Sequence, residues 1–381
     1  MKAAGIITEL NPFHSGHAHL IREARRLSGA DFVVTVMSGD FVQRGEPAVF
    51  DKYTRTRQAL EGGADLVFEL PVRFCLSSAG DFALGGILAL SSLGFVNDLY
   101  FGSECGELEP LMQTAEILYQ ESSEGHTGYS LALQSALKHG LSYPAARAHA
   151  MSQVTSVARE ILEEPNNILG IEYCHALLKL NSSIVPHTIP REGQHYNDGE
   201  SFSPNGGHPS ATALRRQIYL SETPHLCLED CSEIIGYALL REDDLTKYKD
   251  ISPDLAARIK KGIDSYRDIT GFVRDCQTRT FTESRIRRAL LQCALGLTGT
   301  SVSMPYLRLL GMNKKAGVLL RSTPDTLQIL TKLSSDERQL DNTALDLLSK
   351  DILASDWYRQ MWHKKYEEKL PNEYQRSVIV L

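Results

Sequence analysis

Residues 5–17 read GIITELNPFHSGH, and this stretch decides the fold that we expect for the chain. The apolar run at 3–8 has the length of a buried strand, and a helical pattern occupies residues 17–27 after a polar turn. A strand, a short turn and a helix in this order predict the first unit of a parallel α/β sheet.

The following residues repeat this alternation. Further apolar runs at 31–37, 65–70 and 98–101 predict strands, while 51–61 and 77–93 predict helices, with Asp51 as an N-cap. We therefore expect a Rossmann-like parallel sheet. Three polar or glycine-rich clusters (9–17, 38–45 and 102–104) follow strand ends and should share one rim of that sheet, where such folds bind ligands.

The middle and the end of the chain have a different character. Residues 107–181 are mostly helical in pattern, with a break at Pro165-Asn166-Asn167, and a strand is expected at 183–189. A polar, glycine-rich loop at 194–209 leads to a helix capped by Ser210. We place a domain boundary within 221–230, which divides the chain into a nucleotide-binding domain (1–222) and a mainly helical domain (223–381).

Composition limits the classes of protein. The 381 residues are 42% hydrophobic and 23% charged, values typical of globular proteins. Apolar runs are too short to span a membrane, the N-terminus lacks a signal-peptide pattern, and the seven cysteines are an odd, scattered set. These features predict a cytoplasmic protein with reduced thiols and no membrane association.

The turn at 11–17 carries the strongest chemical signal. Backbone amides and the positive end of a helix dipole bind phosphate at such a turn, and Gly16 lets a ligand approach the backbone. His14 and His17 lie three residues apart, so both imidazoles face one side of the first helical turn. Two alternatives remain for these residues: histidines whose hydrogen bonds are made within the core, or a metal site that adds His19.

A second candidate metal site also needs to be considered. Cys227 and Cys231 form a CxxxC without a second ligand pair, and we predict no metal site.

Charge is unevenly distributed. The net charge is −7, but residues 255–321 contain thirteen Lys or Arg against four acids, a net of +9. A basic segment on an acidic protein is typical of a localised polyanion-binding surface, although solvated helix faces would give the same count. The predicted RNA contacts in this segment are Lys260, Lys261, Arg285, Arg287, Arg288, Lys314 and Lys315.

Several long motifs resemble one family. The HxGH turn and a later Ser-Ala-Thr-Ala-Leu-Arg helix start resemble the HIGH-type nucleotidyltransferase superfamily. The stretches MSGDFVQRGEPAVFDKYTRTRQAL, GADLVFELP, YFGSE, PNNILGIEY and IPREG are similar to those of the bacterial tRNA(Met) cytidine acetate ligase family. The resemblance covers the N-terminal domain and extends loosely into the helical region.

The resemblance implies a two-step reaction. Acetate attacks the α-phosphate of ATP, which gives acetyl-adenylate and pyrophosphate. The exocyclic amine of the wobble cytidine in the anticodon of elongator tRNA(Met) then takes the acetyl group, and AMP leaves. ATP is thus a substrate, and Mg²⁺ is a candidate companion of its phosphates.

The resemblance also implies the ATP contacts. Asn166 and Asn167 are alternatives for one contact, with a weak preference for Asn167. The implied set is Ile7, Thr8, Glu9, Leu10, Asn11, Pro12, Phe13, His14, Ser15, Gly16, His17, Ala18, His19, Leu20, Gly102, Asn166 or Asn167, and Arg191.

Chemical roles can be assigned to some residues. His14 and His17 are the predicted catalytic groups at the α-phosphate, and Lys52 is predicted to meet the leaving pyrophosphate. Arg191 and Arg215 offer guanidinium groups suited to phosphate oxygens. Glu104 is a candidate to orient a histidine, bind Mg²⁺ or cap a helix, while Gln43 and Arg44 are candidates for substrate or RNA contact.

Two other functions remain open at this point. A small-molecule adenylyltransferase that acts on a phosphorylated metabolite would need the nucleotide site but not the basic segment. A nucleotide-sensing RNA-binding module would need the basic segment but not paired histidines and arginines.

Overall fold

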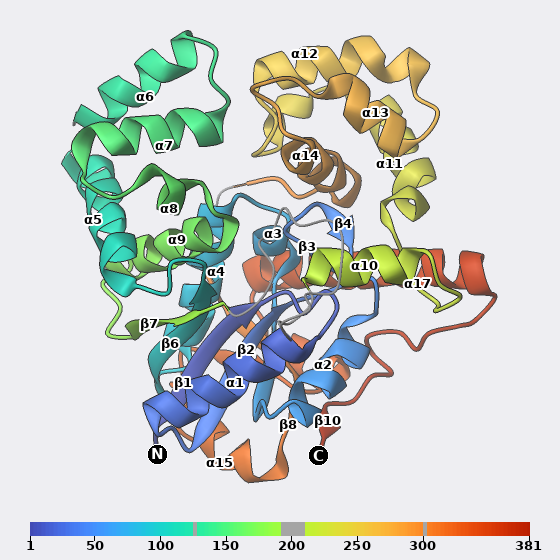
Figure 1. Ribbon diagram of the computed structural model, residues 1–381. Helices are drawn as coiled ribbons and strands as arrows, with labels where there is room; N and C mark the ends of the chain where they lie inside the picture. Colours follow the sequence, from blue (N-terminus) through green and yellow to red (C-terminus); the bar gives the residue numbers. More distant parts are fainter. Residues whose placement is uncertain (125–127, 192–209, 300–302) are drawn as a thin grey trace.

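The centre of the fold is a parallel sheet in the order β5-β2-β1-β6-β7 (Figure 1). The structure is a computed structural model that describes residues 1–124, 128–191, 210–299 and 303–381. The parallel strands are β1 (Ala3–Thr8), β2 (Phe32–Ser38), β5 (Leu66–Leu70), β6 (Val96–Ser103) and β7 (Val185–Pro190). The chain runs from β1 outward to β2 and β5, then returns to the other side of β1 for β6 and β7. The strand order therefore reverses beside β1.

The sheet continues with strands from the end of the chain. β8 (Tyr306–Met312) pairs antiparallel with β5, and both β9 (Gln328–Leu330) and β10 (Ile379–Val380) pair with β8. The region after residue 222 is mainly helical, as expected, but these three strands within it belong to the sheet. Their side chains complete the core of the sheet, with Leu307 and Leu309 on one face and Leu310 on the other.

Helices cover both faces of the sheet. α1 (Ser15–Ser28) and α2 (Lys52–Glu61) pack on one face, where Ile21 and Ala59 meet Ile6 of β1. α4 (Ala79–Ser92), α5 (Leu108–Glu124) and α9 (Pro165–Lys179) belong to the core of the other face, which contains Ile7. The alternation of Ile6 and Ile7 follows from the two-residue period of a strand.

Two groups of helices rise beyond the carboxyl ends of the parallel strands (Figure 1). One consists of α6 (Gly128–Lys138), α7 (Tyr143–Val154) and α8 (Arg159–Glu163), which follow α5 and precede α9 in the chain. The other, here called the helical unit, consists of α11 (Ser232–Arg241), α12 (Pro253–Gly262), α13 (Ile269–Cys276) and α14 (Glu283–Leu295). Short 3₁₀ turns accompany these elements at Leu228–Cys231 (η1), Leu245–Lys247 (η2) and Ile263–Ser265 (η3).

Short elements complete the chain. They are the hairpin β3 (Phe41–Val42) and β4 (Glu46–Pro47), the helices α3 (Val72–Cys75), α10 (Ala211–Tyr219), α15 (Gly317–Leu320) and α16 (Leu333–Asp336), and the 3₁₀ turns Lys314–Ala316 (η4) and Glu337–Gln339 (η5). Within the described ranges no helix is both long and apolar enough to cross a membrane.

α17 (Asn342–Tyr366) fastens the helical unit to the sheet. Trp357 and Met361 pack in the core of the helical unit. On the sheet side, Asp351 accepts hydrogen bonds from the backbone N–H of Val72 at 2.7 Å and from the hydroxyl of Tyr306 at 2.5 Å. α17 therefore contacts both the helical unit and the sheet region.

The local predictions for the first half of the chain are confirmed. The strand at 3–8 has the predicted bounds, and the other parallel strands differ by a few residues at most. Asp51 and Ser210 both act as N-caps, because their side chains accept hydrogen bonds from first-turn amides. The loop at 194–209 lies outside the described residues.

Candidate active site

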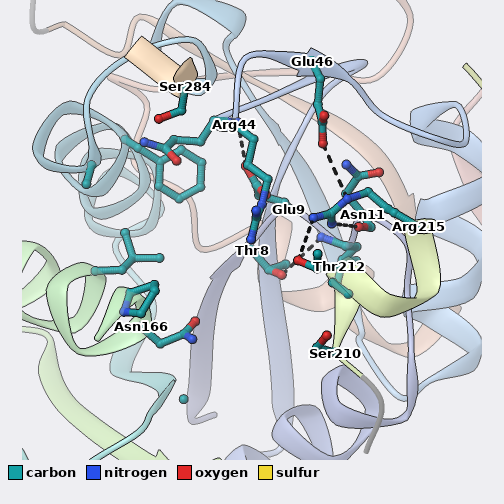
Figure 2. Close-up of a pocket in the computed structure, with 18 of the residues that line it drawn as sticks. Thr8, Glu9, Asn11, Arg44, Glu46, Asn166, Ser210, Thr212, Arg215 and Ser284 are labelled. Carbon is teal, nitrogen blue, oxygen red and sulfur yellow. Dashed lines mark hydrogen bonds and ion pairs between the residues drawn. The ribbon is translucent and has the colours of Figure 1, made fainter. Parts of the chain in front are cut away.

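A cavity of about 870 Å³ opens at the carboxyl end of β1, where the strand order reverses (Figure 2). This is the place at which open α/β sheets bind ligands. The expected shared rim is confirmed, because the segments after β1, β2 and β6 all contribute to the lining. From the predicted ATP segment, the lining residues are Ile7, Thr8, Glu9, Leu10, Asn11, His14, His17 and Leu20, whereas Pro12, Phe13, Ser15, Gly16, Ala18 and His19 lie outside it.

The two histidines of the HxGH turn cap their own helix. His14 is the N-cap of α1, and its Nδ1 accepts a hydrogen bond from the backbone N–H of Gly16 at 3.1 Å. Nδ1 of His17 accepts from the backbone N–H of His14 at 3.3 Å. The rings lie close together, with centroids 3.9 Å apart. This reciprocal arrangement fixes both imidazoles at the start of the helix.

The hydrogen bonds also determine where the protons are. A neutral imidazole that accepts at Nδ1 carries its proton at Nε2, so each ring is a donor at Nε2. Burial, together with the neighbouring His14 and Arg191, lowers the pKa of His17 well below its usual value of 6.5. His17 is therefore a neutral donor at neutral pH.

Among the described residues, five helices line the cavity with their N-terminal ends. The lining residues are the N-cap His14 and first-turn His17 of α1, Ala79 of α4, Asn166 of α9, Thr212 of α10 and Ser284 of α14. Figure 2 shows Asn166, Ser210, Thr212 and Ser284 around the same space. Each helix N-terminus carries a partial positive charge, so their convergence creates a field that favours an anion with several charges.

The two asparagines of the PNN break have different environments. Asn166 lines the cavity, and its Nδ2 donates to Oε1 of Glu104 at 2.5 Å. Asn167 is only 1% exposed, and its Oδ1 accepts from the backbone N–H groups of Glu104 and Cys105 at 2.9 and 3.1 Å. The preference for Asn167 as the ligand contact is therefore wrong, because its amide is used to hold the loop after β6.

Glu104 caps α9. Its Oε1 and Oε2 accept from the backbone N–H groups of Asn166 and Asn167 at 3.2 and 2.8 Å. Gly102 and Arg191 lie on the same side of the cavity. A side chain at residue 102 would place its Cβ 3.2 Å from Cγ of Arg191, so glycine keeps this wall open.

Exchanging the two asparagines for alanine tests this assignment. Asn167→Ala should lower the free energy of unfolding by about 1–3 kcal/mol, since it leaves two amides without their acceptor. Asn166→Ala should leave stability nearly unchanged and raise the dissociation constant for ATP. Thermal unfolding and calorimetric titration of both variants measure this. Equal loss of stability in both would contradict the distinction.

Arg215 reaches the cavity from α10 and is 6% exposed. Its Nη1 donates to the carbonyl of Asn11 at 2.7 Å, and its Nε lies 3.5 Å from Oε1 of Glu46 (Figure 2). Asn11 in turn accepts from the backbone N–H of Val49 at 2.9 Å, while its buried Nδ2 has no partner among the described residues. A buried amide without an acceptor at the cavity wall is suited to a ligand oxygen.

Lys52 does not lie on the cavity rim, and its predicted catalytic role is wrong. The side chain is fully buried. Its Nζ donates to Oε1 of Glu69 at 2.6 Å and to the hydroxyl of Ser355 at 2.8 Å, and it lies 3.1 Å from Oε2 of Glu373. These partners come from β5, α17 and the C-terminal segment. Lys52 therefore joins distant parts of the chain and does not face the ligand space.

The basic residues do not form one surface. Lys260 and Lys261 are exposed on α12, and Arg285 lies against the ring of Phe281, 5.2 Å from its centroid. Lys314 and Lys315 are exposed after β8, whose end pairs with the beginning of β5, so they lie at the opposite end of the sheet from the cavity. Their inclusion in a common RNA surface with α12 is therefore wrong.

Two arginines of α14 have structural contacts. Arg288 is 8% exposed; its Nε lies 3.1 Å from Oδ2 of Asp250 and its Nη1 donates to the carbonyl of Gln43 at 3.3 Å. Its prediction as an RNA contact is wrong, because this side chain holds the β3–β4 hairpin. Arg287 lines the cavity and pairs with Glu283 at 2.9 Å. Gly45 (φ 78°) allows the hairpin to meet α14, since a Cβ there would lie 2.6 Å from Cβ of Arg287.

Sequence reasoning missed part of the cavity. Gln277, Thr282, Glu283 and Ser284 come from the loop before α14 and its first turn, while Phe82 and Tyr173 form apolar parts of the wall. The Thr-Glu-Ser start of α14 is a recognisable helix N-terminus, but nothing local places it opposite β1.

A metal site is not built by the described residues. Within those ranges no group of three His, Cys, Asp or Glu side chains is placed to hold a metal ion. Glu104 uses both carboxylate oxygens on α9, and the described cysteines, including Cys227 and Cys231, are free thiols. The described residues do not form a dedicated Mg²⁺ site.

The parallel sheet, the cavity at its reversal point and the capping HxGH turn define a nucleotidyltransferase of the HIGH class. Residues 1–373 match the HIGH Nucleotidyl Transferase family. The chain is 38% identical to the tRNA(Met) cytidine acetate ligase of Caldicellulosiruptor saccharolyticus over 88% of each chain, and 35% identical to that of Acetivibrio thermocellus over 90% of each. The chain belongs to the tRNA(Met) cytidine acetate ligase family of HIGH nucleotidyltransferases.

Solved structures agree with this assignment. The crystal structure of Thermotoga maritima TmcAL bound with alpha-thio ATP is similar over the full length of both chains, with a TM-score of 0.86 and 30% identity. Apo TmcAL from the same organism gives a TM-score of 0.87 at 31% identity.

Proposed function

We propose that this chain is an AMP-forming ligase that joins acetate to the N4 amine of the wobble cytidine of elongator tRNA(Met), through an acetyl-adenylate. The names of the relatives and the ATP analogue bound to TmcAL support tRNA and ATP as substrates. The alternative of a metabolite adenylyltransferase has no such support.

In this proposal ATP occupies the part of the cavity that lies between the N-termini of α1 and α10 and the residues Gly102, Asn166 and Arg191. Its phosphates lie at the N-termini of α1 and α10, beside the Nε2 donors of His14 and His17. The nucleoside lies toward Gly102, Asn166 and Arg191, where the absence of a side chain at residue 102 leaves room for it. The apolar side chains of Phe101 and Leu169 line this end of the cavity.

In the first step an acetate oxygen attacks the α-phosphorus of ATP, and the bond to the β-phosphate oxygen breaks. Negative charge grows on the α-phosphate oxygens as the transition state forms. Neutral Nε2–H donors on fixed rings stabilise this charge without reorganisation. The guanidinium of Arg215, held by Asn11 and Glu46, adds a fixed positive charge beside them.

In the second step the amine of the cytidine attacks the acetyl carbon, and AMP leaves. The cytidine must leave its base stack to reach the cavity. We place its entry on the side of the cavity that is lined by the β3–β4 hairpin and the first turn of α14.

One observation carries this proposal: the N-terminal ends of five described helices and two neutral Nε2 donors surround one cavity at the end of β1. The first step can be tested without tRNA. Incubation with labelled pyrophosphate and ATP should give exchange of label into ATP only when acetate is present. Exchange without acetate, or exchange that requires a phosphorylated metabolite, would contradict the acetyl-adenylate.

The proposed RNA contacts on α12, Lys260 and Lys261, lead to a separate prediction. Reversing the charges of Lys260 and Lys261 should weaken tRNA binding and reduce the slope of log affinity against log salt by about 1–2, since each lost phosphate contact removes nearly one unit. Reversing Lys314 and Lys315, an equal charge change at the other end of the sheet, should leave both quantities unchanged. A filter-binding series in salt measures this, and equal effects of the two pairs would place the RNA differently.

A further inference from the structure

Glu9 is a carboxylate in a cavity built for anions. It follows β1 directly and lines the cavity beside Asn11 and below Arg44 (Figure 2). The phosphates of ATP and the carboxylate of acetate would both be repelled by its charge. The neutral donors of ATP, its adenine amine and ribose hydroxyls, belong to the nucleoside, which in the proposed arrangement lies toward Gly102 and Asn166. The cytidine brings a neutral N–H donor, its N4 amine, to the hairpin side of the cavity, where Glu9 is anchored through Gln43.

The position of Glu9 is fixed from both ends. Its Oε1 accepts a hydrogen bond from the backbone N–H of Gln43 at 2.6 Å. Its backbone carbonyl accepts from Nη1 of the fully buried Arg55 at 2.7 Å, and the same nitrogen donates to the carbonyl of Ser38 at 3.1 Å. Among the described residues no donor is bonded to Oε2. One oxygen is thus anchored on the hairpin, and the other is available on the cavity side.

From this geometry, and resting on the proposed ligase function, we propose that Glu9 binds the N4 amine of the acceptor cytidine and takes its proton during acetyl transfer. N4 forms a bond to the acetyl carbon, and the bond from that carbon to the phosphate oxygen breaks. The electron pair leaves on that oxygen of AMP, and the N4 proton passes to Oε2. A carboxylate that accepts a hydrogen bond from N4 also recognises cytosine, because uracil has no amine at this position.

The environment makes Glu9 a stronger base than an exposed glutamate. Burial raises its pKa above the ordinary 4.5, and Arg44, the backbone N–H of Gln43 and Arg215 offset part of this shift. Glu46 on the hairpin and Tyr173 on α9 are the other ionisable groups that face it. The rate of transfer should therefore fall with decreasing pH, through a pKa above 4.5.

Glu9→Gln separates this role from a structural one, because the amide oxygen keeps the hydrogen bond from Gln43. We expect single-turnover acetyl transfer to tRNA to fall about 100- to 10,000-fold. Acetate-dependent ATP–pyrophosphate exchange should fall by a much smaller factor, although Glu9 belongs to the predicted ATP segment. The pH dependence of transfer attributed to Glu9 should disappear in the variant. Glu61→Gln, at the exposed end of α2, is the control for loss of one negative charge.

Each outcome decides the proposal. A loss of exchange as large as the loss of transfer in Glu9→Gln would show that Glu9 serves ATP, as a metal-binding carboxylate would. Loss of neither half-reaction would show that Glu9 has no chemical role. Either result overturns the inference. Failure of the wild-type protein to exchange at all would instead overturn the ligase function. Glu9→Asp and the wild-type pH profile keep the test valid if Glu9→Gln does not fold. The aspartate variant should transfer more slowly and retain the pH dependence, and a flat wild-type profile would contradict the base.

Discussion

Replacing His14 by asparagine should reduce acetate-dependent ATP–pyrophosphate exchange about 100- to 1,000-fold, the cost of losing one fixed donor to a developing negative charge. Asparagine is itself a good N-cap, so its side chain can replace Nδ1 as acceptor for the first-turn amides of α1. It cannot replace the donor at Nε2 on the far side of the ring. The variant thus removes the chemical role of His14 and retains the structural one.

His14→Ala is the matched comparison for this experiment. It removes both roles, so it should show the same loss of exchange and an additional loss of about 0.5–2 kcal/mol in the free energy of unfolding. Binding of tRNA should survive in both variants, because the RNA contacts that we propose lie on the helical unit. Normal exchange in His14→Asn would show that the histidine is only a cap.

Lys52→Met should destabilise the protein by about 3–5 kcal/mol, because it leaves buried carboxylates without their cation. Nζ of Lys52 lies 2.6 Å from Glu69, 3.1 Å from Glu373 and 3.8 Å from Asp40. Arg308 also pairs with Glu373 but cannot neutralise the whole group. Chemical unfolding of the variant and the wild-type protein measures the difference.

The pH dependence of this effect has a definite sign. Burial already raises the pKa of Glu69, although Lys52 and Arg308 oppose the shift. Without Lys52 the carboxylates should be even harder to ionise, so the folded variant binds more protons than its unfolded chain. Its deficit in stability should then shrink as the pH is lowered from about 8 to about 6.

An exposed ion pair provides the control for Lys52. Lys249 lies 2.5 Å from Asp81, with 42% of its side chain exposed, and Lys249→Met should cost no more than about 1 kcal/mol. A stable Lys52→Met variant that selectively loses pyrophosphate exchange would contradict the structural assignment and return Lys52 to the active site.

The sequence predicts the parallel part of the fold because the signals there are local. The strand at 3–8, the cap at Ser210 and the turn at 11–17 each depend on neighbouring residues only. The strand at Tyr306–Met312 is different, because Arg308 interrupts its apolar pattern. That arginine is buried only because Glu69 and Glu373 meet it from distant parts of the chain.

The candidate site divides in the same way. The residues at the end of β1 follow from the HxGH turn, whereas Thr282 and Ser284 reach the cavity through the packing of α14 against the hairpin. Charge counting has a similar limit. It detects the excess of Lys and Arg in 255–321, but it does not reveal that Arg288 and Arg308 are buried in ion pairs while Lys314 lies at the opposite end of the sheet.

The fate of a labelled acetate tests the central claim most directly. The protein is incubated with labelled acetate, ATP and elongator tRNA(Met), and the nucleosides of the recovered tRNA are separated. We predict label in N4-acetylcytidine at the wobble position, with one AMP formed for each acetyl group transferred. AMP formation without label in the tRNA, or label in tRNA lacking a wobble cytidine, would contradict the account.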